Sequence, residues 1–190
     1  NGVIKECSFT GQIYGQSYLG GIVSRNEGEI NQCRIEPAAG ISMAVRGSGS
    51  YLGGIAAVNA GEKAQIYGCV INGAVGGTGT DVGGAAGWNT DGASVIGLSG
   101  EYSVSGTDWV GGVIGYNEAA LESVETGARV TVTALEGSAG GIAGCNGSGA
   151  SILRSRNLGE VRSSNGNAAG IAALNEGEIK DCENGGDIMA

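Results

Sequence analysis

The sequence predicts an all-β fold: a right-handed parallel β-helix (β-solenoid) of about six coils, each with about 29 residues and three short strands. Three observations predict it. A glycine-rich phrase recurs at a nearly constant interval, each interval holds short apolar runs bounded by Gly, Asn and Ser, and no sustained helical periodicity occurs. A repeat period of roughly 20–50 residues is typical of stacked units that bury a shared core.

The composition excludes two other glycine-rich architectures. Forty of the 190 residues are glycine, but Pro37 is the only proline and no strict Gly-X-Y period occurs, which excludes a collagen triple helix. Hydrophobic residues make up 41% of the chain and charged residues 15%, the reverse of a disordered composition. A single solenoid domain over residues 1–190 remains.

The charge pattern argues against nucleic acid as a partner. The formal net charge is −9, and the ten Lys and Arg residues are scattered singly. No apolar run reaches the roughly 18 residues that span a bilayer, so we expect no membrane insertion of this segment. Because the chain begins at Asn1 inside one repeat and ends inside another, we expect a fragment of a larger protein, with flanking domains.

The first strand region of each repeat is a double glycine, branched residues and an asparagine, as in Gly111–Asn117 (GGVIGYN). Six copies start 33, 30, 28, 29 and 29 residues apart, at Gly20, Gly53, Gly83, Gly111, Gly140 and Ala169. In every copy the asparagine falls six residues after the first position. Glycine allows a backbone path that a Cβ would obstruct, so each copy should form the same corner.

Stacked coils should align equivalent residues in columns about 4.8 Å apart. The position before the double glycine should face the core, with Leu19, Leu52, Val82, Val110, Ala139 and Ala168. The same holds two residues after the first glycine, with Ile22, Ile55, Ala85, Val113, Ile142 and Ile171. The next position is apolar too, which leaves two alternatives: a strand buried on both faces, or small residues outside.

The second strand region follows the asparagine and ends at a cysteine, as in Asn26–Cys33 (NEGEINQC) and Asn175–Cys182 (NEGEIKDC). The third carries alternating apolar residues, such as Tyr102 with Val104. Short apolar runs between Gly, Asn and Ser are strand and turn signals. Insertions after Cys33 and at 61–69 (GEKAQIYGC) should make two coils less regular.

This double-glycine phrase, followed by Asn and then Ile-x-x-Cys, resembles the GLUG repeat of bacterial secreted and cell-surface proteins. The matching text is GGIVSRN, GGVIGYN and GGIAGCN, with NEGEINQC and NEGEIKDC behind it, and it covers nearly the whole chain. The resemblance implies a repeat region of a large exported protein, of the kind attached to some immunoglobulin-A-cleaving metallopeptidases. It implies no catalytic residue in this segment.

The repeated asparagines predict a structural ladder rather than a ligand-binding row. Asn tolerates left-handed turns, and its amide can bond the equivalent amide of the next coil. The ladder should contain Asn26, Asn59, Asn89, Asn117, Asn146 and Asn175.

The five cysteines are interpreted as core thiols. Cys7, Cys33, Cys69 and Cys182 share one column with Leu98, Val124 and Ser155, and Cys145 stands elsewhere. Leu and Val neither ligate metal nor form disulfides, so the column favours a small or medium apolar residue. No CxxC pair predicts a zinc site, and we expect no metal or cofactor. A Cys7–Cys33 or Cys33–Cys69 disulfide remains the alternative, because neighbouring coils lie within disulfide reach.

The residue types offer little for catalysis, and we expect no enzymatic activity. Histidine is absent, which removes Ser-His and Cys-His pairs and HExxH metallopeptidase sites. Asp81 and Asp108 come closest to a carboxylate pair, on successive coils just before the double glycine. Solvated charge is the simpler interpretation of both.

Aromatic residues are the better candidates for binding. Tyr18, Tyr51 and Trp109 stand two residues before the double glycine, and Trp88 and Tyr116 stand just before the asparagine. Rings that protrude from a rod could stack on sugars, although they could also simply shield the corners of the coil.

Together these features predict a non-enzymatic structural or adhesive segment, a stalk or binding rod, of a bacterial surface or secreted protein. Its partners would be host or cell-wall glycans or proteins. The alternative is a carbohydrate-binding or carbohydrate-active β-helix that uses the aromatic residues. An ice-binding rod would need a regular Thr column, and no such column repeats.

Overall fold

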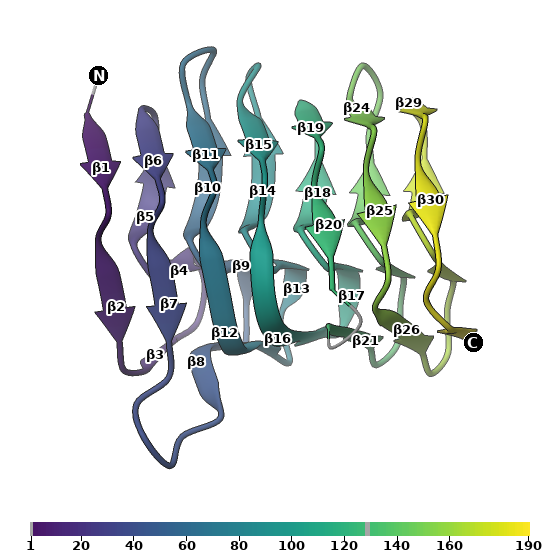
Figure 1. The fold of residues 1–190 in the computed structure, drawn as a ribbon. Helices are drawn as coiled ribbons and strands as arrows, with labels where there is room; N and C mark the ends of the chain where they lie inside the picture. The colour runs from purple at the N-terminus through teal and green to yellow at the C-terminus, as the bar shows by residue number, and fades with distance from the viewer. Residues whose placement is uncertain (1, 128–129) are drawn as a thin grey trace.

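The computed structural model describes residues 2–127 and 130–190, and every regular element in these residues is a β-strand. Strands of successive coils pair in parallel, with equivalent residues in register, so the chain forms a β-solenoid of about six turns. The coils stack along a rod, and the N- and C-termini of the chain lie at its two opposite ends (Figure 1). The predicted all-β solenoid is confirmed.

Five parallel sheets, here named A to E, run along the rod. Sheet A contains β1 (Val3–Lys5), β6 (Glu29–Asn31), β11 (Gln65–Tyr67), β15 (Ser94–Ile96), β19 (Ala120–Glu122), β24 (Ser151–Leu153) and β29 (Glu178–Lys180). Sheet B contains β2 (Ser8–Thr10), β3 (Ile13–Gly15), β7 (Arg34–Glu36), β8 (Met43–Gly47), β12 (Val70–Gly77), β16 (Ser99–Gly106), β21 (Thr131–Ala134), β26 (Glu160–Ser163) and β31 (Ile188–Met189).

The other three sheets have shorter strands. Sheet C contains β4 (Leu19–Gly20), β9 (Ser50–Gly53), β13 (Thr80–Gly83), β17 (Asp108–Gly111), β22 (Ala139–Gly140) and β27 (Ala168–Ala169). Sheet D contains β5 (Val23–Asn26), β10 (Ala56–Ala60), β14 (Ala86–Thr90), β18 (Ile114–Asn117), β23 (Ala143–Asn146) and β28 (Ala172–Asn175). Sheet E contains β20 (Glu125–Thr126), β25 (Arg156–Asn157) and β30 (Glu183–Asn184).

Each coil therefore holds more than the three strands that the apolar runs predicted. A central coil passes through sheets C, D, A and B, as β13, β14, β15 and β16 do, and later coils add a strand of sheet E. The reason is that the double glycine lies at a corner. It divides the first predicted strand into one strand of sheet C and one of sheet D.

The double glycine is required by close backbone contacts at this corner. A Cβ on the first glycine would lie 1.8–2.0 Å from the carbonyl oxygen of the residue three positions on, at Gly20, Gly53, Gly83, Gly111 and Gly140. A Cβ on the second would lie 2.1–2.3 Å from a glycine carbonyl oxygen of the next coil, at Gly21, Gly54, Gly84, Gly112 and Gly141. No side chain fits at such distances, so the phrase recurs because every coil makes the same contact.

A second corner has a left-handed residue in every coil, where the chain leaves sheet A for sheet B or, in the last three rows, for sheet E. The residue directly before the cysteine column has positive φ in all seven rows: Glu6, Gln32, Gly68, Gly97, Ser123, Arg154 and Asp181. Polar residues and glycine fill this position because they tolerate or locally stabilise the left-handed conformation. The column position that follows then turns inward.

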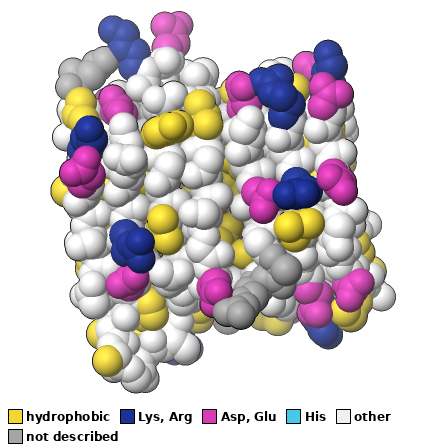
Figure 2. All heavy atoms as spheres, viewed as in Figure 1, with side chains coloured by type: hydrophobic (Ala, Val, Ile, Leu, Met, Phe, Trp, Pro, Cys, Tyr) yellow, Lys and Arg dark blue, Asp and Glu magenta, His cyan; other side chains and the backbone are white. Residues whose placement is uncertain are grey.

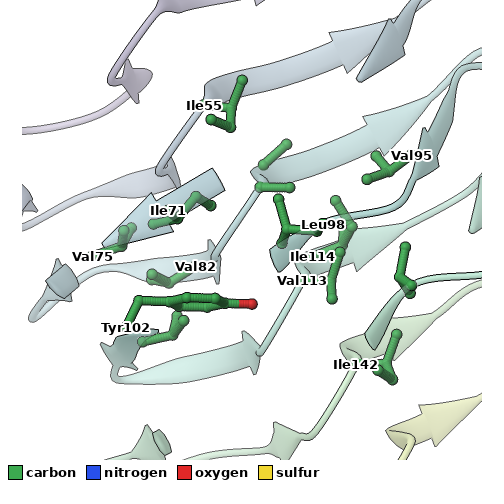
Figure 3. Close-up of a cluster of buried hydrophobic side chains, with 14 of the residues drawn as sticks. Ile55, Ile71, Val75, Val82, Val95, Leu98, Tyr102, Val113, Ile114 and Ile142 are labelled. Atoms are coloured by element: carbon green, nitrogen blue, oxygen red, sulfur yellow. The ribbon is translucent and has the colours of Figure 1, made fainter. Parts of the chain in front are cut away.

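The core lies between the sheets and is filled by the predicted columns. Figure 3 shows side chains from all four main sheets pointing into one interior, among them Val95, Ile71, Val82 and Ile114. Ile55 and Ala56, which stand side by side in the sequence, are both fully buried. The corner explains this, because the backbone turns between them. Every residue of β10 and of β23 is buried, so the alternative of a strand buried on both faces is correct for these coils.

Inside the core the predicted asparagine ladder is confirmed. Each Nδ2 donates to the Oδ1 of the next coil, over 2.7 Å from Asn26 to Asn59, 2.9 Å in the next two steps, and 2.8 Å from Asn117 to Asn146 and from Asn146 to Asn175. The Asn117 amide also closes its own turn by bonding Ala119. A second ladder, between Asn157 and Asn184 of sheet E (2.7 Å), was not predicted.

The insertions leave the stacking intact. The segment 37–42 forms a loop between β7 and β8 that extends beyond the rod, and both strands still pair with β12 (Figure 1). The register of β8 shifts between Ala74 and Val75 of β12, which is the local irregularity that the sequence predicted.

We expect Gly112→Ala to destabilise the rod by about 1–3 kcal/mol, because its Cβ would overpack against Gly141 O at 2.1 Å. Gly112 does not have positive φ, so overpacking rather than a strained dihedral is the cause. Gly127→Ala is the matched control, because its Cβ would meet only Gly100 O, at 3.8 Å. Urea unfolding measures both. Equal stability of the two variants would contradict the corner contact.

We expect Asn117→Ala to cost about 1–3 kcal/mol of unfolding free energy, because it removes two buried hydrogen bonds, the one from Asn89 Nδ2 and the one to Asn146 Oδ1. Asn175→Ala, at the exposed end of the ladder, should cost clearly less. Thermal unfolding of the two variants checks this. An Asn117→Ala melting curve that overlays that of the parent protein would mean that the ladder does not stabilise the fold.

Candidate functional site

The five aromatic residues that the sequence singled out form an aromatic cluster on the outer side of the corner between sheets C and D. Tyr18 and Tyr51 have ring centroids 5.1 Å apart, and Tyr51 stacks on Trp88 at 5.4 Å with an interplanar angle of 23°. Trp109 meets Tyr116 edge to face at 6.3 Å. Rings of sheet C thus contact rings of sheet D in two groups, one with Tyr18, Tyr51 and Trp88 and the other with Trp109 and Tyr116.

A third row of small residues brings the two sheets close enough for these contacts. A Cβ on Gly87 would lie 2.5 Å from Tyr51 Cα, and one on Gly115 would lie 2.3 Å from the Asp81 carbonyl carbon. Gly144 has the same relation to the Trp109 backbone, at 2.4 Å. The backbone of each aromatic or acidic residue of sheet C therefore rests directly on a strand of sheet D.

Part of the cluster is structural. Tyr51 and Trp88 pack on a small separate group of buried residues, Ala57, Val58 and Ala60. All four rings other than Tyr18 are partly covered, whereas Tyr18 is 53% exposed. The rings therefore shield the corner, as one alternative predicted, and also keep part of their surface in solvent.

Four residues that stand two positions before the double glycine have a left-handed backbone conformation. Tyr18, Tyr51, Asp81 and Trp109 have φ of 57°, 61°, 53° and 49°. This conformation costs a non-glycine residue roughly 1–2 kcal/mol. At the other left-handed corner glycine and polar residues fill the position, but here three of the four residues are aromatic. A strained backbone conformation at a non-glycine residue is typical of positions where the side chain has a functional role.

Asp81 lies between two aromatic residues of sheet C. The repeat register predicted this column, two residues before the double glycine, but not a role for Asp81 in it. Its in-register neighbours are Tyr51 and Trp109, because Thr80 and Val82 pair with the residues that flank them. Burial raises the pKa of Asp81, a hydrogen bond from Thr80 (2.9 Å) opposes the rise, and the Asp108 carboxylate adds to it.

The carboxylate of Asp108 is engaged in hydrogen bonds with the backbone. Its Oδ1 accepts the N–H groups of Trp109 (2.8 Å) and Ser138 (2.6 Å), so this carboxylate holds the turn between two coils. The interpretation of Asp81 and Asp108 as merely solvated charges was wrong, because both are partly buried and one caps a turn. A carboxylate fixed by two backbone donors is a poor nucleophile or general acid.

Glu118 completes the polar part of the site. It follows the ladder residue Asn117, and its Oε2 accepts hydrogen bonds from Trp88 Nε1 (2.8 Å) and Thr90 Oγ1 (3.0 Å). This fixes the plane of the Trp88 ring. The pKa of Tyr51 is raised first by burial and then by Asp81, Tyr18 and Glu118, so these acidic groups surround its hydroxyl.

The opposite face of the rod has a different character. Figure 2 shows basic and acidic side chains next to one another over sheets A, B and E. They include the exposed pairs Arg34–Glu36 (2.9 Å) and Arg156–Glu125 (2.7 Å) and the pair Arg154–Glu122. Exposed pairs of this kind contribute little stability, and they leave no surface of one sign there.

The cysteines are all free thiols. Cys33 and Cys69 are buried in the core cluster, which confirms the core-thiol prediction for these two. Cys145 is buried as well, but it pairs in register with Tyr116 of sheet D and lies outside the core cluster. The prediction was wrong for Cys7, which is exposed, and only partly correct for Cys182, because these residues lie in the terminal coils and lack a covering neighbour. Burial raises the pKa of Cys69 and of Cys145 to about 11.

Among the described residues no group of three or more Cys, Asp or Glu side chains is placed to hold a metal ion. The same residues contain no helix long and apolar enough to cross a bilayer. Comparison with protein-family models, curated proteins and solved structures finds no match to this chain.

We expect a thiol reagent to modify Cys7 first and Cys182 next in the native protein, and Cys33, Cys69 and Cys145 only after unfolding. The buried thiols react slowly because they are covered and because their raised pKa keeps them protonated at neutral pH. Peptide mass spectrometry after timed labelling measures the order. Rapid native labelling of Cys33 or Cys69 would contradict the core position.

Proposed function

We propose that this chain is a non-enzymatic adhesive segment, a stalk or binding rod, of a bacterial secreted or cell-surface protein, with repeats of the GLUG type. The observation that carries the proposal is the aromatic cluster. It gathers partly exposed rings on one corner of a rod whose opposite face carries paired charges. The partners would be host or cell-wall molecules, and flanking domains of the same chain would be held apart by the rod.

The stalk part of this proposal rests on how the backbone is used. Strands of adjacent coils are joined by parallel ladders, and two asparagine ladders add side-chain bonds inside the core. A backbone that is paired on both sides offers few extended segments to a protease. Such a rod is suited to an exposed position outside the cell.

The non-enzymatic part rests on the chemistry of the acidic residues. The carboxylate of Asp108 accepts hydrogen bonds from two backbone N–H groups, and the carboxylate of Glu118 accepts them from Trp88 Nε1 and Thr90 Oγ1. Asp81 is the remaining carboxylate in the cluster, and glycoside hydrolysis by the usual route needs two that are free to act.

Carbohydrate binding is the second candidate function. The partly exposed indole rings of Trp88 and Trp109 combine an apolar face with a polar edge, which suits the faces of sugar rings. In this case the rod would be a lectin-like module rather than a passive spacer.

We expect Trp88→Ala or Trp109→Ala to reduce binding of the protein to host cells and to arrayed glycans by about tenfold, because each removes a partly exposed ring from the cluster. Tyr14→Ala is the matched control: Tyr14 is 62% exposed in sheet B, away from the cluster. Binding that survives both Trp substitutions would contradict the proposed face. Release of reducing sugars from any arrayed glycan would contradict the non-enzymatic assignment.

A further inference from the structure

The aromatic cluster has a carboxylate at its centre with no cationic partner. Asp81 lies between Tyr51 and Trp109 in sheet C, and these two rings meet Trp88 and Tyr116 of sheet D. The acidic residue therefore stands between two ring pairs, Tyr51–Trp88 on one side and Trp109–Tyr116 on the other. Among the described residues no Lys or Arg forms an ion pair with Asp81 or with Glu118.

Electrostatic effects show how closely the acidic groups surround the rings. The pKa of Tyr116 is raised by burial and then by Cys145, Glu118, Glu176 and Asp81. The pKa of Cys145 is raised first by burial and then by the charges of Glu176, Glu118 and Asp81. Among the described residues, Arg25 is the one Lys or Arg in the strands of sheets C and D, and it is paired with Glu27 at 2.6 Å. The corner therefore combines ring surfaces with uncompensated negative charge.

We infer that the aromatic cluster around Asp81 binds the quaternary ammonium group of a small organic cation. Such a cation is attracted by the faces of Trp and Tyr rings and by a nearby carboxylate, and it has no N–H groups that need acceptors. This inference rests on the proposed function, because it names the ligand class for the face through which the rod is proposed to adhere.

Other ligands fit the cluster less well. A neutral sugar needs several free polar groups, but Trp88 Nε1, Thr80 Oγ1 and the Asp108 Oδ1 already bond within the protein. A metal ion needs more oxygen ligands than the described residues bring together. A primary ammonium is strongly hydrated and would find few acceptors beyond Asp81.

The charge on Asp81 gives the site a pH dependence. A bound cation favours the ionised carboxylate, whereas burial, the main cause, and the Asp108 charge favour the protonated one. Affinity should therefore be highest above the raised pKa of Asp81 and fall as the pH decreases through it. Glu118, Glu176, Tyr51, Tyr116 and Cys145 also face this region, and the Glu118 and Glu176 charges should act in the same direction as Asp81.

The test is a calorimetric titration with choline and with its neutral isostere, 3,3-dimethyl-1-butanol. We expect choline to bind about tenfold more tightly than the isostere, because only choline carries the charge. Trp109→Leu and Asp81→Asn should each weaken choline binding by a similar factor, and Tyr14→Leu should leave it unchanged. Asn tolerates the left-handed conformation of position 81, so the Asp81→Asn variant should fold.

Phosphocholine and Nε-trimethyl-lysine form two further arms, and saturable binding of either supports the inference while identifying the carrier of the ammonium group. Equal affinity for choline and the isostere, or no binding of choline, would overturn it. If a neutral oligosaccharide binds instead and binding is lost in Trp109→Leu, the cation inference fails but the proposed adhesive function stands. If Trp109→Leu and Trp88→Leu change neither choline binding nor cell binding, the cation inference and the proposed adhesive function both fail.

Discussion

The structure depends on one contact: the backbone of each coil touches the backbone of the next at the double-glycine corner. At Gly54 and Gly112 a glycine carbonyl oxygen of the next coil occupies the place of a Cβ. This contact fixes the angle between sheets C and D and the separation of the coils at the same time. The parallel ladders, the core columns and the asparagine ladder all require that separation to be constant, so a single geometric constraint sets the period of the whole chain.

The same constraint creates the surface at which we place the function. Because Gly87, Gly115 and Gly144 let sheet C lie on sheet D, outward side chains of both sheets meet at the corner. The left-handed residues Tyr51, Asp81 and Trp109 then project into the same region. The residues proposed to bind are therefore held by closely packed backbone, so the proposed site would be rigid and preformed rather than ordered on binding.

Much of this could be predicted from sequence because translational repetition makes equivalent residues into neighbours. The period predicted the solenoid, the core columns and the ladder from Asn26 to Asn175, and the recurring glycines predicted one corner. The number of strands was underestimated, because the double glycine was assigned to one strand region, whereas its corner divides that region between sheets C and D. For the candidate site the rings and the column position of Asp81 were found, but the role of Asp81 and the whole of Glu118 were missed, because these depend on which side chains turn outward at a corner. The exposure of Cys7 was missed because repeat reasoning treats terminal and central coils alike.

The most direct test of the central contact is a set of through-space proton contacts measured by NMR in the folded protein. The account predicts cross-coil contacts between backbone protons of Gly84 and Gly112 and of Gly112 and Gly141, pairs that lie 28 and 29 residues apart in the sequence. It also predicts contacts between the side-chain amides of Asn89 and Asn117. Backbone contacts of these glycines confined to their own repeat would contradict stacking at the double-glycine corner, and with it the origin of the repeat.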